Sequence, residues 1–214
     1  TAMSSETQNI TNDPYDIHDR ATRSVILNYE GKGDTKAFTD AQEISYLQYD
    51  VYGNSERQAI DTYSASDMAL ASLTSHKVIE NNYGSTGETI SVLQADGVTT
   101  NKSAAYARKK GNTLSSTVTE YTGKTESLDT LISRTISTTS LFDIKGNAID
   151  QQSDRFVADA SDSLTLVTRT AIHNGDIDAR GDAHTQEITT FTTDSTGANL
   201  LETDYQVITS RSFD

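Results

Sequence analysis

The feature that most limits how this chain can fold is a phrase that returns at a nearly constant spacing. The phrase reads "YDVYGN" from Tyr49 and "FDIKGN" from Phe142, and in both copies an aromatic residue follows the glycine by ten positions. Alignment on this glycine gives starts near 15, 49, 83, 107, 142, 177 and 213, which lie 34, 34, 24, 35, 35 and 36 residues apart. Self-similarity at such a period indicates a repeat protein, whose units depend on their neighbours for stability.

The alignment also predicts how the chain is divided. Residues 1–14 are expected to be an N-terminal tail, left either by processing or by cloning. Residues 15–214 are expected to hold six tandem repeats, with starts near 15, 49, 83, 107, 142 and 177, and the beginning of a seventh at 213. The third repeat is the short one, because only 24 residues separate its start from the next.

A single repeat has the pattern of a β-hairpin. Residues 41–50 and 55–63 are two strand-like runs, and Gly53 and Asn54 between them accept the positive φ of a tight turn. The aspartate of the phrase, here Asp50, is expected to accept hydrogen bonds from backbone groups two residues on and so to start the turn. Segments rich in Ser, Thr, Asp and Gly join one hairpin to the next.

These hairpins predict an all-β fold. We expect tandem β-hairpin repeats of ~35 residues that form a long antiparallel meander, in an extended, coiled or solenoid-like sheet. No helical periodicity is sustained, and the best helical candidate, residues 67–73, is short and uncapped. Only 34% of the residues are hydrophobic, so the core is expected to be thin.

An aromatic column recurs about once per repeat. It consists of Tyr29, Tyr63, Tyr121, Phe156 and Phe191. Aromatic pairs across strands contribute about 0.2–1 kcal/mol each relative to alanine pairs, so the column is expected to stabilise the sheet. The same residues are the candidate binding site, because exposed rings could stack on sugars.

Charge and composition exclude several classes of partner. The net charge of −14 argues against nucleic acid, which is bound through clustered Lys and Arg. No apolar run reaches the roughly 20 residues of a membrane span. The chain has no cysteine, so disulfides and thiolate metal sites are excluded.

"YDVYGN" and "FDIKGN" resemble the Tyr-Asp-x-x-Gly signature of YD-repeat proteins, the Rhs and teneurin-like class. The sequence is similar more generally to tandem β-hairpin repeats of large bacterial surface proteins. This resemblance covers most of the chain. It implies a β-structure that encloses, spaces or adheres at the cell surface or outside the cell, and it implies no chemistry.

Motifs that carry chemistry are scarce. The four histidines are His18, His76, His173 and His184, and none has a carboxylate or a second histidine at ligand spacing. No nucleophile elbow, phosphate loop or metalloprotease helix is present in the sequence. The acidic clusters at 12–19 and 175–182 could offer oxygen ligands to Ca²⁺, but solvated turns explain them more simply. We therefore expect a protein that is not an enzyme and has no catalytic residue or cofactor.

These observations predict a non-catalytic structural segment of an extracellular or cell-surface protein, acting as a stalk, spacer or adhesin. Two alternatives are a carbohydrate- or protein-binding β module and a self-assembling fibre subunit joined by edge strands. The expected partners are neighbouring repeats or like subunits that pair through strand edges. A surface glycan or protein is the other candidate partner, and neither nucleic acid nor a membrane span is expected.

Overall fold

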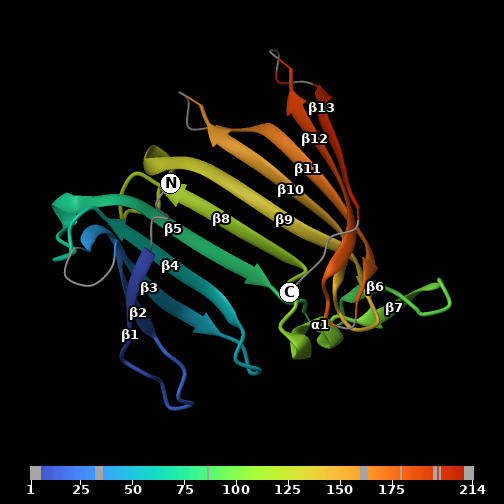
Figure 1. Ribbon diagram of the computed structural model, residues 1–214, viewed down its shortest axis with the longest axis horizontal. Helices are drawn as coiled ribbons and strands as arrows, with labels where there is room; N and C mark the ends of the chain where they lie inside the picture. Colours follow the sequence, from blue (N-terminus) through green and yellow to red (C-terminus); the bar gives the residue numbers. More distant parts are fainter. Residues whose placement is uncertain are drawn as a thin grey trace. The chain divides into compact units, whose positions relative to one another are not determined.

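The computed structural model describes residues 6–31, 36–85, 87–159, 163–178, 180–194, 197 and 199–209. The described residues form thirteen strands, and all of them belong to one sheet (Figure 1). They are β1 (Glu6–Asn12), β2 (Arg23–Glu30), β3 (Ala37–Tyr49), β4 (Ser55–Tyr63), β5 (Leu73–Asn82), β6 (Thr89–Leu93), β7 (Thr99–Ser103), β8 (Ser115–Tyr121), β9 (Leu131–Asp143), β10 (Ala148–Ala158), β11 (Leu164–Ile177), β12 (Ala183–Thr193) and β13 (Leu200–Ile208).

The sheet is a meander, as the sequence predicts. Its strands follow the order β1-β2-β3-β4-β5-β8-β9-β10-β11-β12-β13, and the path does not close on itself. Strands β6 and β7 form a side hairpin, and β6 joins the sheet by pairing with β9 in parallel, with Ser91 opposite Leu141. The prediction of an all-β fold with antiparallel hairpins is therefore confirmed, with this one parallel pairing as an addition.

The chain divides into two compact units. The first unit holds residues 1–80 and 119–132, and the second holds residues 81–118 and 133–214. Strand β1 of the first unit lies inside the segment 1–14 that the sequence predicts to be a tail, and it pairs with β2 along its whole length. From Glu6 this segment is thus part of the sheet. Its polar sequence, ETQNITN, lacks the apolar alternation that would have predicted a strand.

The second unit contains the one α-helix of the described residues. Helix α1 (Ala105–Lys110) ends at Gly111, which has a φ of 72°. It lies where the sequence predicts the start of a repeat at 107. Ala, Arg and Lys are strong helix formers and Gly is the usual residue after a helix end, so local preference overrides the repeat here. The 67–73 candidate contains only the 3₁₀ turn η2 (Leu70–Ser72).

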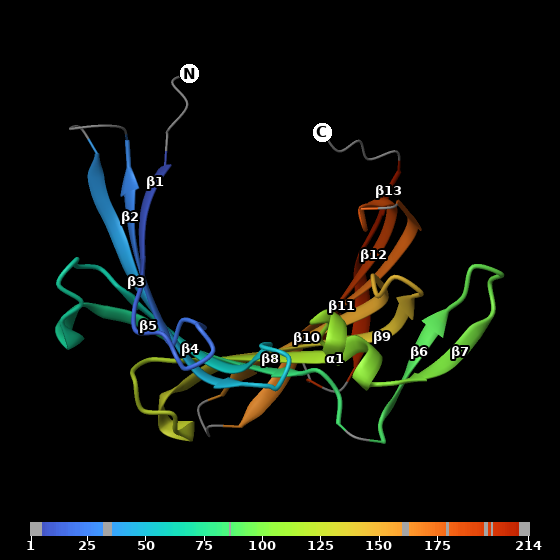
Figure 2. The same cartoon turned by 90° about the horizontal axis from the view of Figure 1, so that it is seen from below.

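The core is thin. In the second unit a cluster of buried residues joins α1 to β6 and β9; it consists of Ile90, Val92, Ala104, Ala107, Leu114 and Phe142. By contrast, no residue of β11, β12 or β13 is buried among those described. These strands are therefore open to water on both faces, and backbone ladders hold them together more than a core does (Figure 2).

Four hairpin turns share one hydrogen-bonding pattern. They begin at Asp16, Asp50, Asp143 and Asp178. In each turn one carboxylate oxygen accepts hydrogen bonds from the backbone N–H groups two and four residues on. The third residue after each aspartate has a positive φ; these residues are Asp19, Gly53, Gly146 and Gly181. The predicted role of the aspartate is confirmed at these four turns.

Within each unit, consecutive turns are hydrogen-bonded to one another. In the first unit, Nη1 of Arg20 donates to the carbonyl oxygen of Asp50 at 3.2 Å. In the second unit, Nδ2 of Asn112 donates to the carbonyl oxygen of Gly146 at 2.5 Å, and Nζ of Lys145 donates to that of Asp178 at 3.2 Å. Each turn therefore supplies a donor to the backbone of the next.

Candidate functional site

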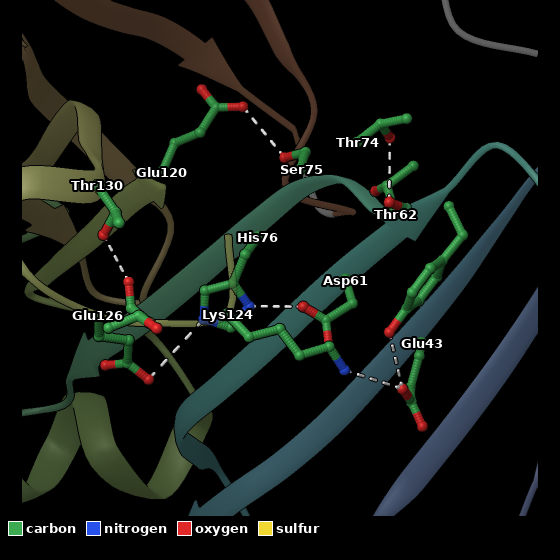
Figure 3. Close-up of polar contacts among 12 residues, drawn as sticks. Glu43, Asp61, Thr62, Thr74, Ser75, His76, Glu120, Lys124, Glu126 and Thr130 are labelled. Atoms are coloured by element: carbon green, nitrogen blue, oxygen red, sulfur yellow. Dashed lines mark hydrogen bonds and ion pairs between the residues drawn. The ribbon is translucent and has the colours of Figure 1, made fainter. Parts of the chain in front are cut away.

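A row of polar residues crosses three strands of the first unit (Figure 3). Glu43 of β3 lies opposite Asp61 of β4, and Asp61 lies opposite His76 of β5. Side chains at directly opposite positions project from the same face of a sheet. On this face of β4, Asp61 lies between two buried residues, Ala59 and Tyr63, and is itself buried.

Lys124, from the segment that follows β8, lies over this row. Its Nζ atom is 2.7 Å from Oδ2 of Asp61 and 3.8 Å from Oε2 of Glu43. The other oxygen of Asp61 is 2.5 Å from Nδ1 of His76. The Asp61 side chain is only 9% exposed, and a buried carboxylate costs several kcal/mol unless it is paired. Both of its oxygens have partners, so this cost is offset.

The electrostatics of Lys124 and Tyr63 reflect the same pairing. Burial acts to lower the pKa of Lys124, but the hydrogen bonds and charges of Asp61 and Tyr63 outweigh it and hold this pKa well above its usual range. Burial raises the pKa of the Tyr63 phenol, and the neighbouring carboxylates of Asp61 and Glu43 add to this effect. Lys124 therefore carries a positive charge, and this charge stabilises the buried carboxylate of Asp61.

The second nitrogen of His76 is buried and has no hydrogen-bond partner among the described residues. This atom, Nε2, lies 3.9 Å from Oε1 of Glu126. Glu126 is in turn held by Arg57 of β4, at 2.5 Å from its Nη2. The ring of His76 also lies against Tyr121, with 5.9 Å between the ring centroids.

The geometry of His76 limits the chemistry of the cluster. An aspartate bound to Nδ1 of a histidine is two thirds of a hydrolytic triad, which requires a hydroxyl or thiol at Nε2. Here Nε2 faces the carboxylate of Glu126, while the neighbouring hydroxyl of Ser75 contacts Glu120 at 3.2 Å. Within the described ranges no three His, Asp or Glu side chains are placed to hold a metal ion. What the arrangement does is fasten the segment after β8 to the sheet.

The predicted aromatic column has a structural counterpart. Four of its members directly follow a shift in the register of a strand ladder; they are Tyr29, Tyr63, Phe156 and Phe191. In each case the extra residue of the β-bulge lies in the neighbouring strand, opposite the aromatic residue. A β-bulge bends the strand that contains it and increases the local twist. The column therefore marks the end of a strand at which the chain turns toward the next hairpin.

The structure does not gather the column into one exposed surface. Tyr63 is 1% exposed, so protein atoms cover its ring and a sugar cannot stack on it. Tyr29 contacts the edge of Phe38, and Nζ of Lys36 lies 4.5 Å from its ring centroid. Tyr29, Tyr63 and Tyr121 belong to the first unit and the two phenylalanines to the second. Packing within the sheet accounts for the contacts of Tyr29 and Tyr63.

Spacing along the chain did not reveal the two histidine–aspartate pairs. His76 contacts Asp61, 15 residues away, and Nδ1 of His173 lies 2.6 Å from Asp150, 23 residues away. Both pairs cross between neighbouring strands, so ligand spacing along the chain could not find them. The one usable signal was that Asp61 and His76 fall at equivalent positions on either side of a predicted reversal.

The two acidic clusters considered for Ca²⁺ are turns in the structure. The hydrogen bond from Arg20, followed by those from the backbone N–H groups of Arg20 and His18, outweighs burial and lowers the pKa of Asp16 to about 2. Backbone N–H groups, that of Asp182 first, lower the pKa of Asp178. These carboxylate oxygens already accept hydrogen bonds from the turn, which is the role that the sequence favoured for them.

Comparison with known proteins adds little. No family model matches the sequence, and no curated protein matches it. Among solved structures, the chain is similar to a protein of unknown function from Bacteroides fragilis NCTC 9343, whose crystal structure was determined at 1.90 Å resolution. The two are 9% identical over 95% of this chain and 92% of the other, with a TM-score of 0.29. A likeness this weak carries no argument about function. In the part of the chain that is described, no helix has the length and apolar character needed to cross a membrane.

Proposed function

We propose that this chain is a structural segment of an extracellular or cell-surface protein, built from tandem hairpin repeats and acting as a spacer, stalk or adhesin. The observation that carries the proposal is the recurrence of one turn with the same hydrogen bonds at Asp16, Asp50, Asp143 and Asp178. In each copy an aromatic residue follows ten positions after the positive-φ residue and lies beside a β-bulge of the neighbouring strand.

A second recurring contact supports the same proposal. Asp61 pairs with His76, and Asp154 pairs with Arg169, with both Arg169 contacts at 2.7 Å. Both aspartates lie eight positions after the turn glycine, and both partners lie 15 residues further on. Two hairpins that place an acid and a base at equivalent positions support a common repeating unit.

The proposed location rests on the resemblance to YD-repeat proteins and on composition. A net charge of −14 keeps an open sheet from associating through its faces, because like charges repel. The buried charges of the cluster around Asp61 are used to hold the fold. A structural role therefore accounts for the residues that would otherwise suggest an active site.

A deletion in phase with the repeat tests the proposal. Removal of residues 143–177 joins Phe142 to Asp178 and deletes one full period of 35 residues. Ala183 would then lie opposite Phe142, where Ala148 lies now, because the two turns have the same register. We expect the shortened chain to keep the circular dichroism of a β-sheet and to unfold cooperatively in urea.

The control deletion removes residues 143–159, which contain the last residue of β9, the turn after it and the single strand β10. It reverses the direction of every strand that follows and places later turns at the wrong edge. We expect this variant to lose cooperative unfolding. If both deletions damage folding equally, the hairpins are not interchangeable units and the repeat interpretation fails.

Strand β13 favours one further function, self-assembly through strand edges. β13 ends the path of the sheet, and on one of its faces Tyr205 and Val207 are 54% and 53% exposed. Edge strands of this kind add strands from other chains. The test is the mass in solution across a range of concentrations, with Val207→Lys as the variant expected to prevent association. A chain that stays monomeric at all concentrations rules this out.

A further inference from the structure

An open hollow lies between the first two Asp turns, within the first unit. It has a volume of about 550 Å³, which is in the range of small-molecule sites. Its lining consists of His18, Arg20, Tyr49, Asp50, Val51, Tyr52 and Gly53. These residues are distinct from the buried charge cluster and from the aromatic column.

The floor of the hollow is fixed by contacts within the protein. Arg20 donates to the carbonyl oxygen of Asp50, and its guanidinium carbon lies 4.5 Å from the centroid of the Tyr49 ring. The hydroxyl of Tyr49 donates to the carbonyl oxygen of Ala21 at 2.7 Å. A surface that is ordered before binding loses little conformational entropy when a ligand arrives.

The rim of the hollow carries residues that the turn itself does not require. Turn geometry accounts for Asp50, Gly53 and Asn54, but not for Val51, which is 89% exposed, or Tyr52, which is 49% exposed. Both side chains meet water beside a concave surface. Apolar residues grouped in this way mark sites of interaction more often than isolated ones do.

The charges around the hollow select the class of ligand. Arg20 is paired with Asp16 at 2.6 Å, so its charge is already neutralised. With a net charge of −14 on the whole chain, an anionic ligand would be repelled. Tyr52 and His18 each offer a ring face with a hydrogen-bonding group at its edge. A ligand with apolar C–H faces and neutral hydroxyl groups matches this surface.

We propose that this hollow binds a neutral carbohydrate, with one sugar ring stacked on Tyr52 and its hydroxyl groups hydrogen-bonded by the Tyr52 phenol and the His18 imidazole. Val51 covers the edge of the bound sugar, and the Arg20–Tyr49 pair forms the floor. Sugar binding here is independent of the structural role, because the chain could space domains whether or not this hollow is filled.

Titration with defined sugars tests the site. The probes are neutral tetrasaccharides of glucose, galactose, mannose and N-acetylglucosamine, each added to ¹⁵N-labelled protein and followed by two-dimensional NMR. We expect at least one probe to shift the backbone amides of Val51, Tyr52 and Gly53. Tyr52→Ala should weaken its binding by about tenfold, the loss of one stacking contact. Tyr52→Phe should retain most of the affinity, because it keeps the ring.

Tyr205→Ala is the matched control. Tyr205 is 54% exposed, close to the value for Tyr52, and lies on β13 in the second unit. This variant should bind the probe as the unchanged protein does. Unchanged amides of β2, Arg23–Glu30, which lies in the same unit as Tyr52, will show that Tyr52→Ala is folded. The proposal is overturned if no tetrasaccharide shifts the amides of 51–53, if Tyr52→Ala binds as tightly as the parent, or if only an apolar peptide binds there.

Discussion

A substitution at Gly146 measures most directly how much the contacts between neighbouring turns contribute to stability. Its φ is +93°, and a Cβ atom added there would lie 2.8 Å from Cδ of Lys110 and closer still to Nδ2 of Asn112. Both side chains donate hydrogen bonds to this turn, Lys110 to the carbonyl oxygen of Lys145 and Asn112 to that of Gly146. Alanine at 146 therefore forces these donors away from the carbonyls that they now bind.

The size of the effect follows from comparison with Gly97. Gly97 also has a positive φ, +81°, but a Cβ added there meets nothing within 4 Å. An L-residue in the left-handed region costs about 1–2 kcal/mol, and both substitutions incur this cost. Only Gly146→Ala also loses hydrogen bonds, at about 0.5–1.5 kcal/mol each. We expect it to destabilise the protein by about 1–3 kcal/mol more than Gly97→Ala does.

Urea unfolding followed by circular dichroism measures both free energies. Asn112→Ala provides the double-mutant cycle: in its background, Gly146→Ala should cost about 1 kcal/mol less, because the clash with Asn112 and one of the lost hydrogen bonds are already absent, while the clash with Lys110 remains. The reasoning is refuted if Gly146→Ala and Gly97→Ala cost the same, or if the cost at 146 is unchanged when Asn112 is absent. Either result would mean that the turns do not stabilise one another.

Three further results are expected. Lys124→Met should destabilise the first unit by about 1–3 kcal/mol, because it leaves Asp61 buried without its cation. The control is Lys77→Met: Lys77 is as exposed as Lys124, at 44%, but pairs on the surface with Glu120, so its loss should change the urea midpoint little. Tyr63→Ala should cost about 3–5 kcal/mol in the same assay, because the ring is 1% exposed. Tyr63→Phe should cost less, because it keeps the buried ring and loses only the hydroxyl contacts to Glu43, at 3.4 Å, and to Lys124. The pKa of Asp16 is about 2, below its unfolded value near 4, so the stabilisation that Asp16 contributes is present above pH 4 and is lost as the pH falls through 2. NMR titration of the His18 amide, which donates to Asp16, should show this midpoint, and Asp16→Asn should abolish it.

The Asp turns were predictable because their chemistry is local. A carboxylate that binds backbone groups two and four residues on, with a residue of positive φ in between, needs no information from elsewhere in the chain. Asp50 and Gly53 therefore appear in the sequence as they do in the structure. The strand ends next to the turns were predictable for the same reason: the predicted runs 41–50 and 55–63 meet the turn as β3 and β4 do, although β3 begins earlier, at Ala37.

The charge cluster was not predictable because it depends on register. Asp61 contacts His76 only because the register of the β4–β5 ladder places the two residues opposite each other. This register shifts shortly afterwards, between Thr62 and Tyr63. A bulge adds one residue to one strand, and nothing in the local sequence states where it occurs. Helix α1 was missed for the opposite reason: its local preference was present in the sequence, but the repeat alignment was given priority over it.

A sheet with so little core must obtain its stability from contacts that recur. The aromatic residue beside a bulge, the Asp turn and the cross-strand acid–base pair each appear in both units, whereas the buried apolar cluster of the second unit surrounds α1. Contacts within and between adjacent hairpins add up along the sheet in proportion to the number of hairpins. A buried core shared by distant strands would not extend in this way. The sequence is therefore suited to growth by whole hairpins, which is the property that a spacer requires.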